Sequence, residues 1–485
     1  MLFNSINFVI FFSILFLVYY FVLDEKTKFQ NWLLLLSSYF FYGFADLKML
    51  SLLIGSTLVF FYLGKFIGAE YNSYKSSWYT KIAVILGVGL LIYFKYMNFF
   101  IESFASLFGM IGLRSNFGTF NIIIPLGISF FTFKLISYVI DIHRRKIEPA
   151  EDLIAFATYV AFFPTIMSGP IDRPNLFIPQ LLEKRIFDYS LAVDGSRQIL
   201  WGLFQKLVIA DNLAIYTNQV WANISDYSGS TLLLIAVFYA FQLYTDFSGY
   251  SHIAIGVGKL LGFRITANFN YPFFSRDVAE YWRKWHMSLT SWLTDYVFIP
   301  LNVEFRNYGN YGIILAIMIN MLVVGMWHGA NFTFAVFGIY HGLLFIPLIL
   351  SGKIFKKSKK LIVNRFGIPS SEDLIKMLST FMLVTLGLVI FRAKSMTQTL
   401  EYFSRMFSRS IFSIPQFQGR LAALLIVFGI LIMVVIEWIQ RRKDHPLQID
   451  SIVKHRQLRW LIYYTLLSAF WFFSGEGQQF VYFQF

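Results

Sequence analysis

Residues 310–351 read NYGIILAIMINMLVVGMWHGANFTFAVFGIYHGLLFIPLILS and decide the fold, because two apolar runs flank the pair Trp327 and His328. The runs cover residues 310–327 and 331–351, close to the roughly 20 apolar residues that a helix needs to cross the hydrocarbon of a bilayer. The stretch therefore predicts two membrane helices joined by a short turn that carries an imidazole. An ionisable side chain at that depth is costly, so His328 is a candidate functional residue.

The composition of the whole chain also indicates a membrane protein. Of its 485 residues, 57% are hydrophobic and 14% are charged, whereas soluble domains have roughly 45–50% apolar and about 25% charged residues. We therefore predict an all-α polytopic membrane protein with about 11–13 membrane segments. The apolar runs that predict spans are residues 6–23, 30–44, 48–67, 80–101, 120–141, 196–215, 231–258, 310–327, 331–351, 374–392, 421–440 and 458–474.

A further apolar run, residues 151–168, is short and contains Pro164 before ending at Ser168, Gly169 and Pro170. Irregular backbone at membrane depth is tolerated where it lines a cavity inside the protein. We therefore predict that this run is a re-entrant segment and not a complete span.

The charge of the chain indicates a lipid bilayer, and no nucleic acid, as its surroundings. There are 41 Lys and Arg against 27 Asp and Glu, a net charge of +14, and the positive-inside rule concentrates basic residues in cytoplasmic loops. Residues 217–230 contain no Lys or Arg, so we place that loop, the turn at His328 and the C-terminus on the outer side. We place on the cytoplasmic side the basic groups at residues 143–146, 259–284, 353–360 and 441–459.

A second histidine, His286, lies in the polar stretch 272–300. Asp277, with Glu280 three residues later, is typical of a helix start. Helical spacing would place Trp282 and His286 on one face of that helix. The stretch is too polar for an ordinary span, so we predict a helix that lies at the interface or dips into the bundle.

Several enzyme classes are excluded because their motifs are absent. The sequence has no GxSxG elbow, no HExxH and no other cluster with metal-ligand spacing, and Gly256–Lys259 lacks the first glycine of a P-loop. It has no cysteine, which excludes disulfides, thiolate metal sites and a cysteine nucleophile. We therefore predict no bound metal and no serine hydrolase, metalloprotease or NTPase activity.

The residues by themselves leave two interpretations of each histidine open. His328 fits a general base, because a neutral imidazole can take a proton from an attacking hydroxyl near neutral pH, and Trp327 can form a wall of the site. His286 fits a residue that orients an acyl donor or stabilises an oxyanion. Each histidine equally fits a structural role, bonded within the bundle or lining a channel.

Asp246 is a carboxylate inside a long apolar run, where an unpaired charge is expensive. It either lines a substrate cavity or holds a helix break at Gly249, and Trp285 is a further candidate for the cavity lining. A transporter or flippase, with Asp246 and the histidines along a permeation path, is one alternative to an enzyme. A membrane scaffold that recruits a secreted enzyme is another.

Several motifs together resemble the membrane-bound O-acyltransferase (MBOAT) superfamily, and within it the bacterial alginate and peptidoglycan O-acetyltransferase branch. The resemblance covers most of the chain. It implies a single transmembrane domain over residues 1–485, with a central funnel or tunnel, core motifs in 151–351, and C-terminal spans with an aromatic tail in 374–485. The motifs are residues 163–171, 244–262, 282–301, 326–330 and 480–485.

The resemblance also implies a function in the bacterial cytoplasmic (inner) membrane. Acetyl-CoA would be the donor substrate, with no bound cofactor, and the acceptors would be hydroxyls of an extracytoplasmic polysaccharide such as alginate-like exopolysaccharide or peptidoglycan. A secreted partner with an SGNH-hydrolase-like fold is expected beside it. His328 matches the signature histidine of the superfamily, and His286 matches its second motif histidine.

The aromatic tail carries a further expectation from the resemblance. Tyr482 would accept the acyl group briefly as a relay, and the alternative is an amphipathic tail anchored at the interface. The D-alanyl transferase of teichoic acid synthesis is a close relative, and residues 168–173 resemble it too. The length of this chain and its own aromatic tail favour the acetyltransferase.

Overall fold

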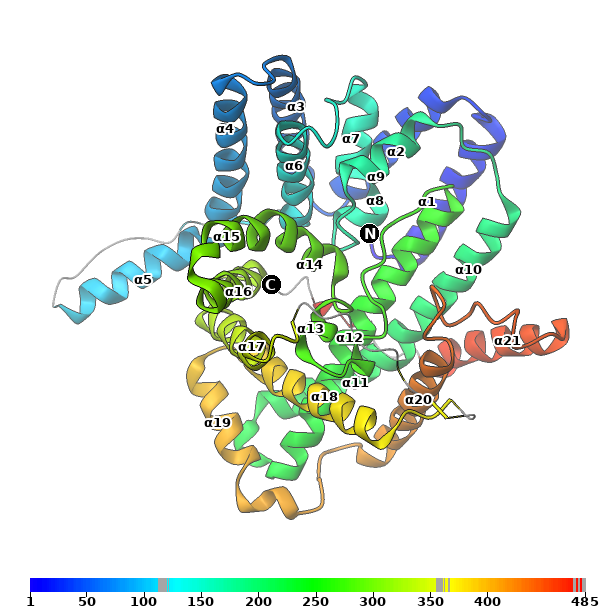
Figure 1. Ribbon diagram of the computed structural model, residues 1–485. Helices are drawn as coiled ribbons and strands as arrows, with labels where there is room; N and C mark the ends of the chain where they lie inside the picture. The colour runs from blue at the N-terminus through cyan, green and yellow to red at the C-terminus, as the bar shows by residue number, and fades with distance from the viewer. Residues whose placement is uncertain are drawn as a thin grey trace. The chain divides into compact units, whose positions relative to one another are not determined.

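The computed structural model describes residues 1–111, 120, 122–354, 361, 363–364, 367–473, 477–478 and 480–481. Over these residues the secondary structure is helical, and the one β feature is an isolated bridge between Val363 and Pro369 (Figure 1). The predicted all-α class is confirmed.

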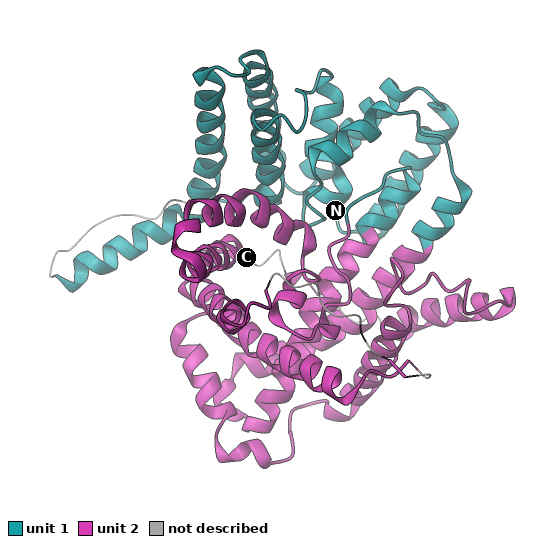
Figure 2. Ribbon diagram, viewed as in Figure 1, with its two compact units in different colours: residues 1–196, 254–266 teal, residues 197–253, 267–485 magenta. Residues whose placement is uncertain are grey.

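The described residues form two compact units (Figure 2). Unit 1 comprises residues 1–196 and 254–266, and unit 2 comprises residues 197–253 and 267–485. The chain passes from one unit to the other within α10 (Tyr189–Leu203) and within α12 (Gly229–Leu260). The single transmembrane domain expected from the resemblance stays a prediction.

Unit 1 contains the N-terminal helices, several of which begin at a side-chain cap. Asp46 accepts hydrogen bonds from the backbone of the next helix, and Asp152 does the same for α7, which satisfies N–H groups that have no partner within a helix. Its elements are α1 (Ile6–Leu17), η1 (Val18–Val22), α2 (Thr27–Gly43), α3 (Leu47–Ala69), α4 (Tyr74–Leu91), η2 (Ile92–Tyr96), α5 (Met97–Met110), α6 (Ile128–His143), α7 (Leu153–Ala161), α8 (Phe163–Ile166) and α9 (Pro174–Leu182).

The run predicted to be re-entrant forms two short helices, α7 and α8. They have nine and four residues, and the helix is interrupted at Phe162. Neither is long enough to cross a bilayer, and residues 155–166 are buried within unit 1. The broken, buried backbone supports the prediction of a segment that does not cross the membrane.

Unit 2 contains the remaining helices and, of the predicted site residues, those that the structure describes: Asp246, Trp285, His286, Trp327 and His328. Two of its elements, η3 and η6, have the wider turns of a π-helix. Its elements after α10 are η3 (Phe204–Ala210), α11 (Asp211–Ala222), η4 (Ile224–Asp226), η5 (Pro272–Phe274), α13 (Val278–Trp282), α14 (Met287–Leu293), η6 (Thr294–Phe298), α15 (Ile299–Glu304), η7 (Arg306–Tyr308), α16 (Gly309–His328), α17 (Phe332–Leu350), α18 (Ser371–Arg392), α19 (Met396–Met406), η8 (Arg409–Phe412), α20 (Arg420–Ile439) and α21 (Arg456–Phe473).

The hairpin predicted from residues 310–351 is present as α16 and α17. A Cβ added at Gly325 would lie 2.1 Å from the carbonyl oxygen of Phe334, and one at Gly338 would lie 2.3 Å from that of Met321. Only glycine permits such close packing of two backbones, which is typical of helix contacts in membranes. The hairpin thereby fixes the position of His328 at the end of α16.

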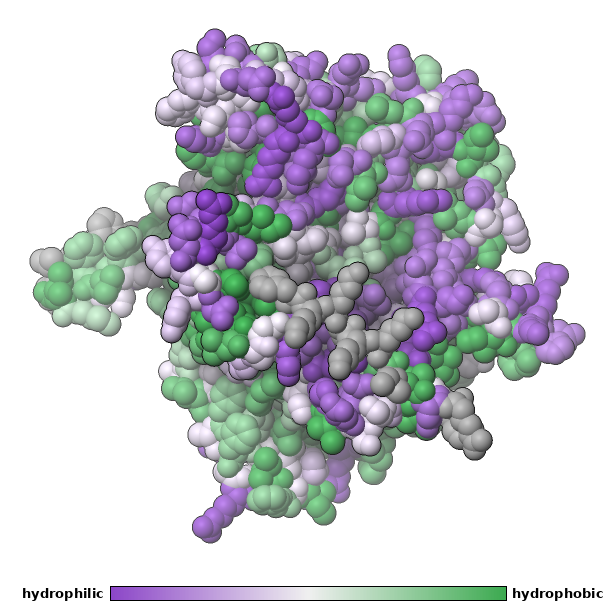
Figure 3. Space-filling view, in the orientation of Figure 1, coloured by the Kyte–Doolittle hydropathy of each residue, from purple (hydrophilic) through white to green (hydrophobic). Residues whose placement is uncertain are grey.

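The lengths and hydropathies of the helices are those of a multi-pass membrane protein. Eight described helical segments are long and apolar enough to cross a bilayer. Phe104 and Leu107 of α5 are exposed, and hydrophobic residues gather over this helix at the left of Figure 3, which suits a lipid-facing surface. The eight segments are residues 47–69, 74–110, 189–222, 229–260, 306–328, 332–350, 371–392 and 420–439.

The other predicted spans also form helices, but these are shorter or more polar. The run from Ile6 to Val22 is an apolar helical segment below the length of the eight. Helices α2 and α6 have 17 and 16 residues, and α21 has 18 residues with a lower mean hydropathy than the longer spans.

Candidate functional site

His328 is the last residue of α16 and lies among aromatic rings of unit 2. Its side chain is 6% exposed. The imidazole packs edge-on against Phe391 of α18, with ring centroids 4.8 Å apart, and its centroid lies 6.3 Å from that of Phe337 on α17. Three helices thus surround the predicted base with apolar walls.

His286 occupies the turn before α14 in a left-handed backbone conformation, with φ of 42°. Such a conformation is costly for a residue with a Cβ and persists only where its surroundings impose it. Here Asn270 donates its backbone N–H to the Lys284 carbonyl at 3.0 Å, and Met287 donates to the Asn268 carbonyl at 2.8 Å. The prediction that His286 continues the helical face of Trp282 is therefore wrong, because α13 ends at Trp282.

Burial fixes the charge state of His286. The residue is 1% exposed, and desolvation lowers its pKa below the ordinary value, because an apolar environment disfavours the charged imidazolium. Its ring packs edge-on against Phe247 of α12 at 4.6 Å between centroids. His286 is thus a neutral imidazole at physiological pH.

Trp327 brings the two histidines together. Its indole packs against His286 at 5.6 Å and against His328 at 4.9 Å, measured between ring centroids, with interplanar angles of 75° and 78°. Residues that are far apart in the sequence therefore contact one side chain. The structure places Trp327 beside both candidate catalytic residues, and its role as a wall of a substrate site stays a prediction.

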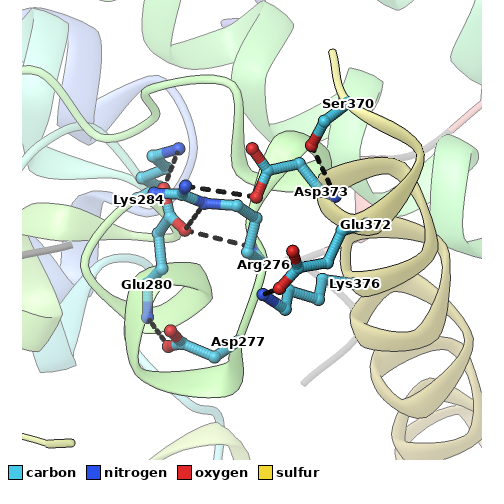
Figure 4. A network of polar contacts seen from close by, with 8 residues as sticks. All are labelled: Arg276, Asp277, Glu280, Lys284, Ser370, Glu372, Asp373 and Lys376. Atoms are coloured by element: carbon cyan, nitrogen blue, oxygen red, sulfur yellow. Dashed lines mark hydrogen bonds and ion pairs between the residues drawn. The ribbon is translucent and has the colours of Figure 1, made fainter. Parts of the chain in front are cut away.

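A network of charged residues holds the segment that precedes His286 (Figure 4). Glu280 pairs with Arg276 at 3.3 Å and with Lys284 at 2.9 Å, and Arg276 also reaches Asp373 at the start of α18 at 3.4 Å. Asp277 accepts a hydrogen bond from the backbone N–H of Glu280 at 2.7 Å. The helix start predicted from Asp277 and Glu280 is confirmed.

The same network sets the protonation of Glu280. Desolvation raises its pKa, but Lys284 and Arg276 outweigh that effect and hold the pKa of Glu280 below its usual value. The carboxylate therefore stays charged and can bind both cations. The turn that presents His286 is thus tied to α18 by ion pairs.

His341 supports the site indirectly. The indole N–H of Trp282 donates to Nδ1 of His341 at 3.3 Å, and His341 is fully buried in α17. This contact links the end of α13 to the hairpin that carries His328. His341 is therefore a polar contact between helices of unit 2.

Asp246 and Trp285, the two further candidates for a cavity lining, make ionic and aromatic contacts, and their place in a cavity lining stays a prediction. Trp285 stacks on Tyr281 at 5.5 Å and meets Phe269 edge-on at 5.1 Å. Asp246 pairs with Lys206 at 2.8 Å and accepts the backbone N–H of Val481 at 2.7 Å. The alternative that Asp246 holds a helix break at Gly249 is wrong, because α12 is continuous from Gly229 to Leu260.

Sequence reasoning missed Lys206 and Asp211. Lys206 pairs with Asp211 at 2.7 Å as well as with Asp246. Both residues fall within the predicted span 196–215, and charged residues inside a span are themselves a signal of function. That signal was available in the sequence, but the partners of each charge were not.

Of the aromatic tail, residues 480–485, the structure describes Phe480 and Val481. Tyr482 lies outside the described residues. Phe480, two residues before it, is buried and packs on Tyr250 at 5.0 Å and on Phe247 at 6.0 Å between centroids. Since Phe247 also contacts His286, the tail reaches the aromatic shell around the histidines.

Comparisons with known proteins agree with the resemblance seen in the sequence. The family model described as MBOAT, membrane-bound O-acyltransferase family, matches residues 36–362. The chain is 35% identical over 414 residues to the probable alginate O-acetylase AlgI of Pseudomonas aeruginosa, covering 84% of this chain and 75% of that protein.

Two further relatives carry other names. The chain is 31% identical over 435 residues to the peptidoglycan O-acetyltransferase of Helicobacter pylori, covering 83% of this chain and 79% of that protein. It is 33% identical over 261 residues to the teichoic acid D-alanyltransferase of Streptococcus thermophilus, covering 51% of this chain and 61% of that protein. The acetyltransferase similarity thus extends over much more of the chain.

Proposed function

The chain belongs to the membrane-bound O-acyltransferase family and is a membrane acyltransferase, and from this premise we propose that it moves acetyl from cytoplasmic acetyl-CoA to hydroxyls of an extracytoplasmic polysaccharide. The observation that carries the proposal is the contact of His286 and His328 with the single indole of Trp327. Family membership removes the transporter and scaffold alternatives.

His328 is the general base of the proposed reaction. Its imidazole takes the proton of a hydroxyl as that oxygen attacks the thioester carbonyl carbon of acetyl-CoA. The C–S bond then breaks, and the imidazolium returns the proton to the departing thiolate, which leaves as the thiol of CoA. The burial of His328 among the rings of Phe337 and Phe391 supports this role, because it keeps bulk water away from the reacting atoms.

His286 assists by stabilising charge. A neutral imidazole that donates a hydrogen bond to the developing oxyanion lowers the barrier, because the donor is already oriented in a water-poor site. The left-handed turn and the ion-pair network around Glu280 support this role, because they hold the ring in one place. Trp327 packs against both imidazoles and holds them next to each other.

The acceptor is a polysaccharide hydroxyl, reached through the tail or a partner. In the relay, the phenol of Tyr482 attacks acetyl-CoA and becomes an acetyl ester. A hydroxyl of the polymer, or the serine of a secreted SGNH-like partner, then attacks that ester and restores the phenol. The names of the alginate and peptidoglycan relatives support a polysaccharide acceptor.

The proposed location is the bacterial cytoplasmic membrane, with the His328 turn and the tail on the outer side. The distribution of Lys and Arg among the loops supports this orientation. A funnel through the bundle would connect the cytoplasmic donor with His328.

The test of the proposed function uses detergent-purified protein with acetyl-labelled CoA and a polysaccharide acceptor. We expect release of free CoA and labelled polymer from wild type, and loss of both in His328→Ala. His455→Ala removes a histidine that is exposed at the surface and serves as the matched control with wild-type activity. If the polymer is labelled from a D-alanyl donor and not from acetyl-CoA, the donor is D-alanyl and not acetyl. If His328→Ala turns over acetyl-CoA as fast as wild type, the proposal is overturned.

The relay has its own test. Tyr482→Phe removes only the phenolic oxygen, so we expect folded protein without polymer acetylation. Normal acetylation by this variant would remove the relay while leaving the general-base role of His328 intact.

A further inference from the structure

Three charged side chains form a buried cluster in unit 2, defined here as the ionic cluster: Lys206, Asp211 and Asp246. The ammonium of Lys206 lies 2.7 Å from a carboxylate oxygen of Asp211 and 2.8 Å from one of Asp246. The Lys206 side chain is 11% exposed and both carboxylates are almost fully buried. Charges at this depth are expensive unless they are paired and hydrogen-bonded.

The local fold is built to bring these three charges together. Lys206 lies in the π-helix η3, and a π-helical turn within an α-helical run often marks a functional site. A Cβ added at Gly249 of α12 would lie 2.7 Å from the carbonyl oxygen of Gly202, and one added at Gly202 would lie 2.5 Å from that of Gly249. The two glycines thus allow α10 and α12 to approach closely enough for Lys206 to reach Asp246.

The same cluster binds the backbone of the C-terminal tail. Lys206 donates to the Gln478 carbonyl at 3.1 Å, and Val481 donates its N–H to Asp246 at 2.7 Å. The backbone of Gln478 is also hydrogen-bonded to Asp211. Every member of the ionic cluster therefore touches the tail, and these contacts use main-chain atoms.

Helix α12 connects this anchor with the histidines. Asp246, which accepts the Val481 N–H, is followed by Phe247, whose ring packs on Phe480 of the tail and on His286. The tail is thus bound to α12 at Asp246 and at Phe247, and Phe247 in turn contacts His286 of the candidate site.

We propose that the ionic cluster is a latch that positions the C-terminal tail beside the His286–His328 site, so that Lys206, Asp211 and Asp246 are positioning residues for acyl transfer. The proposal rests on the proposed function for its catalytic consequence, but the latch itself does not. One ammonium between two carboxylates leaves the ionic cluster with one excess negative charge, and backbone groups of the tail hydrogen-bond to all three side chains.

A cysteine reporter tests the latch without any acyl transfer, because the chain has no cysteine of its own. Val481→Cys keeps the backbone N–H that Asp246 accepts and places a thiol in the buried tail. We expect slow labelling by N-ethylmaleimide in the otherwise wild-type chain. Adding Asp246→Ala should raise the labelling rate roughly tenfold to hundredfold, which corresponds to the loss of a hydrogen bond to a charged group.

A second reporter separates tail release from unfolding. Val384→Cys places a thiol at a buried position of α18, outside the tail segment. Faster labelling of Val481→Cys alone supports the latch. Unchanged labelling of Val481→Cys, or equal acceleration of both reporters by Asp246→Ala, overturns it.

Activity measurements then test the positioning role. Asp246→Ala should lower kcat for acetyl transfer while leaving KM for acetyl-CoA unchanged, and Asp246→Asn should restore part of kcat because its amide oxygen can still accept the Val481 N–H. An unchanged kcat in Asp246→Ala with a released tail overturns the positioning role. Failure of wild type to cleave acetyl-CoA would instead reject the proposed function and leave the labelling result to decide the latch.

Discussion

His286 and His328 are buried among aromatic rings, whereas Lys206, Asp211 and Asp246 are buried against one another. Both regions lie in unit 2, and α12 contributes Phe247 to the first and Asp246 to the second. The histidines can be neutral, so apolar walls suit them. Lys206, Asp211 and Asp246 are charged, and burying any one of these charges without its partners would be costly.

The two regions differ in their proposed roles: the histidines carry out the reaction, and the ionic cluster anchors the tail. A neutral imidazole has one ring nitrogen that can accept a proton and one N–H that can donate a hydrogen bond, which are the two roles proposed for the histidines. The Asp246 carboxylate instead binds an ammonium and a backbone N–H, so it holds the tail in position. We therefore expect substitutions in the first region to affect turnover directly. Substitutions in the second should affect stability and tail position, and turnover only through the position of the tail.

The largest expected effect comes from breaking the ionic cluster. Lys206→Met leaves two carboxylates without their cation, and removing one partner of a buried ion pair costs about 3–5 kcal/mol in the free energy of unfolding. Thermal unfolding in detergent should show the loss, with His328→Gln close to wild type in the same measurement. Equal loss of stability in Lys206→Met and His328→Gln would contradict the distinction between the two regions.

The second effect concerns turnover at the histidine site. His286→Ala should reduce kcat by about 10²–10³, the loss typical of one oxyanion donor. The unfolding temperature should change less than in Lys206→Met. Single-turnover release of CoA measures the chemical step, and a wild-type rate there would assign His286 a purely structural part.

A smaller effect is expected from the network that holds the turn before His286. Glu280→Gln removes the charge that binds Arg276 and Lys284, and we expect a loss of about 1–2 kcal/mol in the free energy of unfolding. The matched control is Glu372→Gln, whose pair with Lys376 is exposed to solvent. That variant should stay within about 0.5 kcal/mol of wild type; a larger loss there than in Glu280→Gln would reject the assigned role.

The smallest effect is a pH dependence of stability. Burial lowers the pKa of His286 in the folded state, so only the unfolded chain takes up this proton as the pH falls below about 6.5. The free energy of unfolding should therefore decrease on the acid side, by about 1 kcal/mol over the first unit below that pH. Comparing wild type with His286→Gln isolates this contribution, and parallel pH profiles for the two would contradict it.

The sequence by itself determined most of the helices and the class of protein, and it pointed to His328 as the principal candidate residue. Apolar runs of bilayer length predict α16 and α17 because a helix closes its hydrogen bonds locally. The capping pair Asp277 and Glu280 is local too, and it predicted the start of α13 correctly. The motif around His328 was readable because neighbouring residues carry it.

Only the tertiary structure decided which groups meet. The left-handed turn at His286 depends on backbone contacts to Asn268 and Asn270, and no helical spacing could supply it. The pairing of Lys206 with Asp246, and of Asp246 with the tail, joins segments far apart along the chain. Ion pairs and ring contacts depend on distance in space, and in this protein the packing of α12 against its neighbours in unit 2 sets those distances.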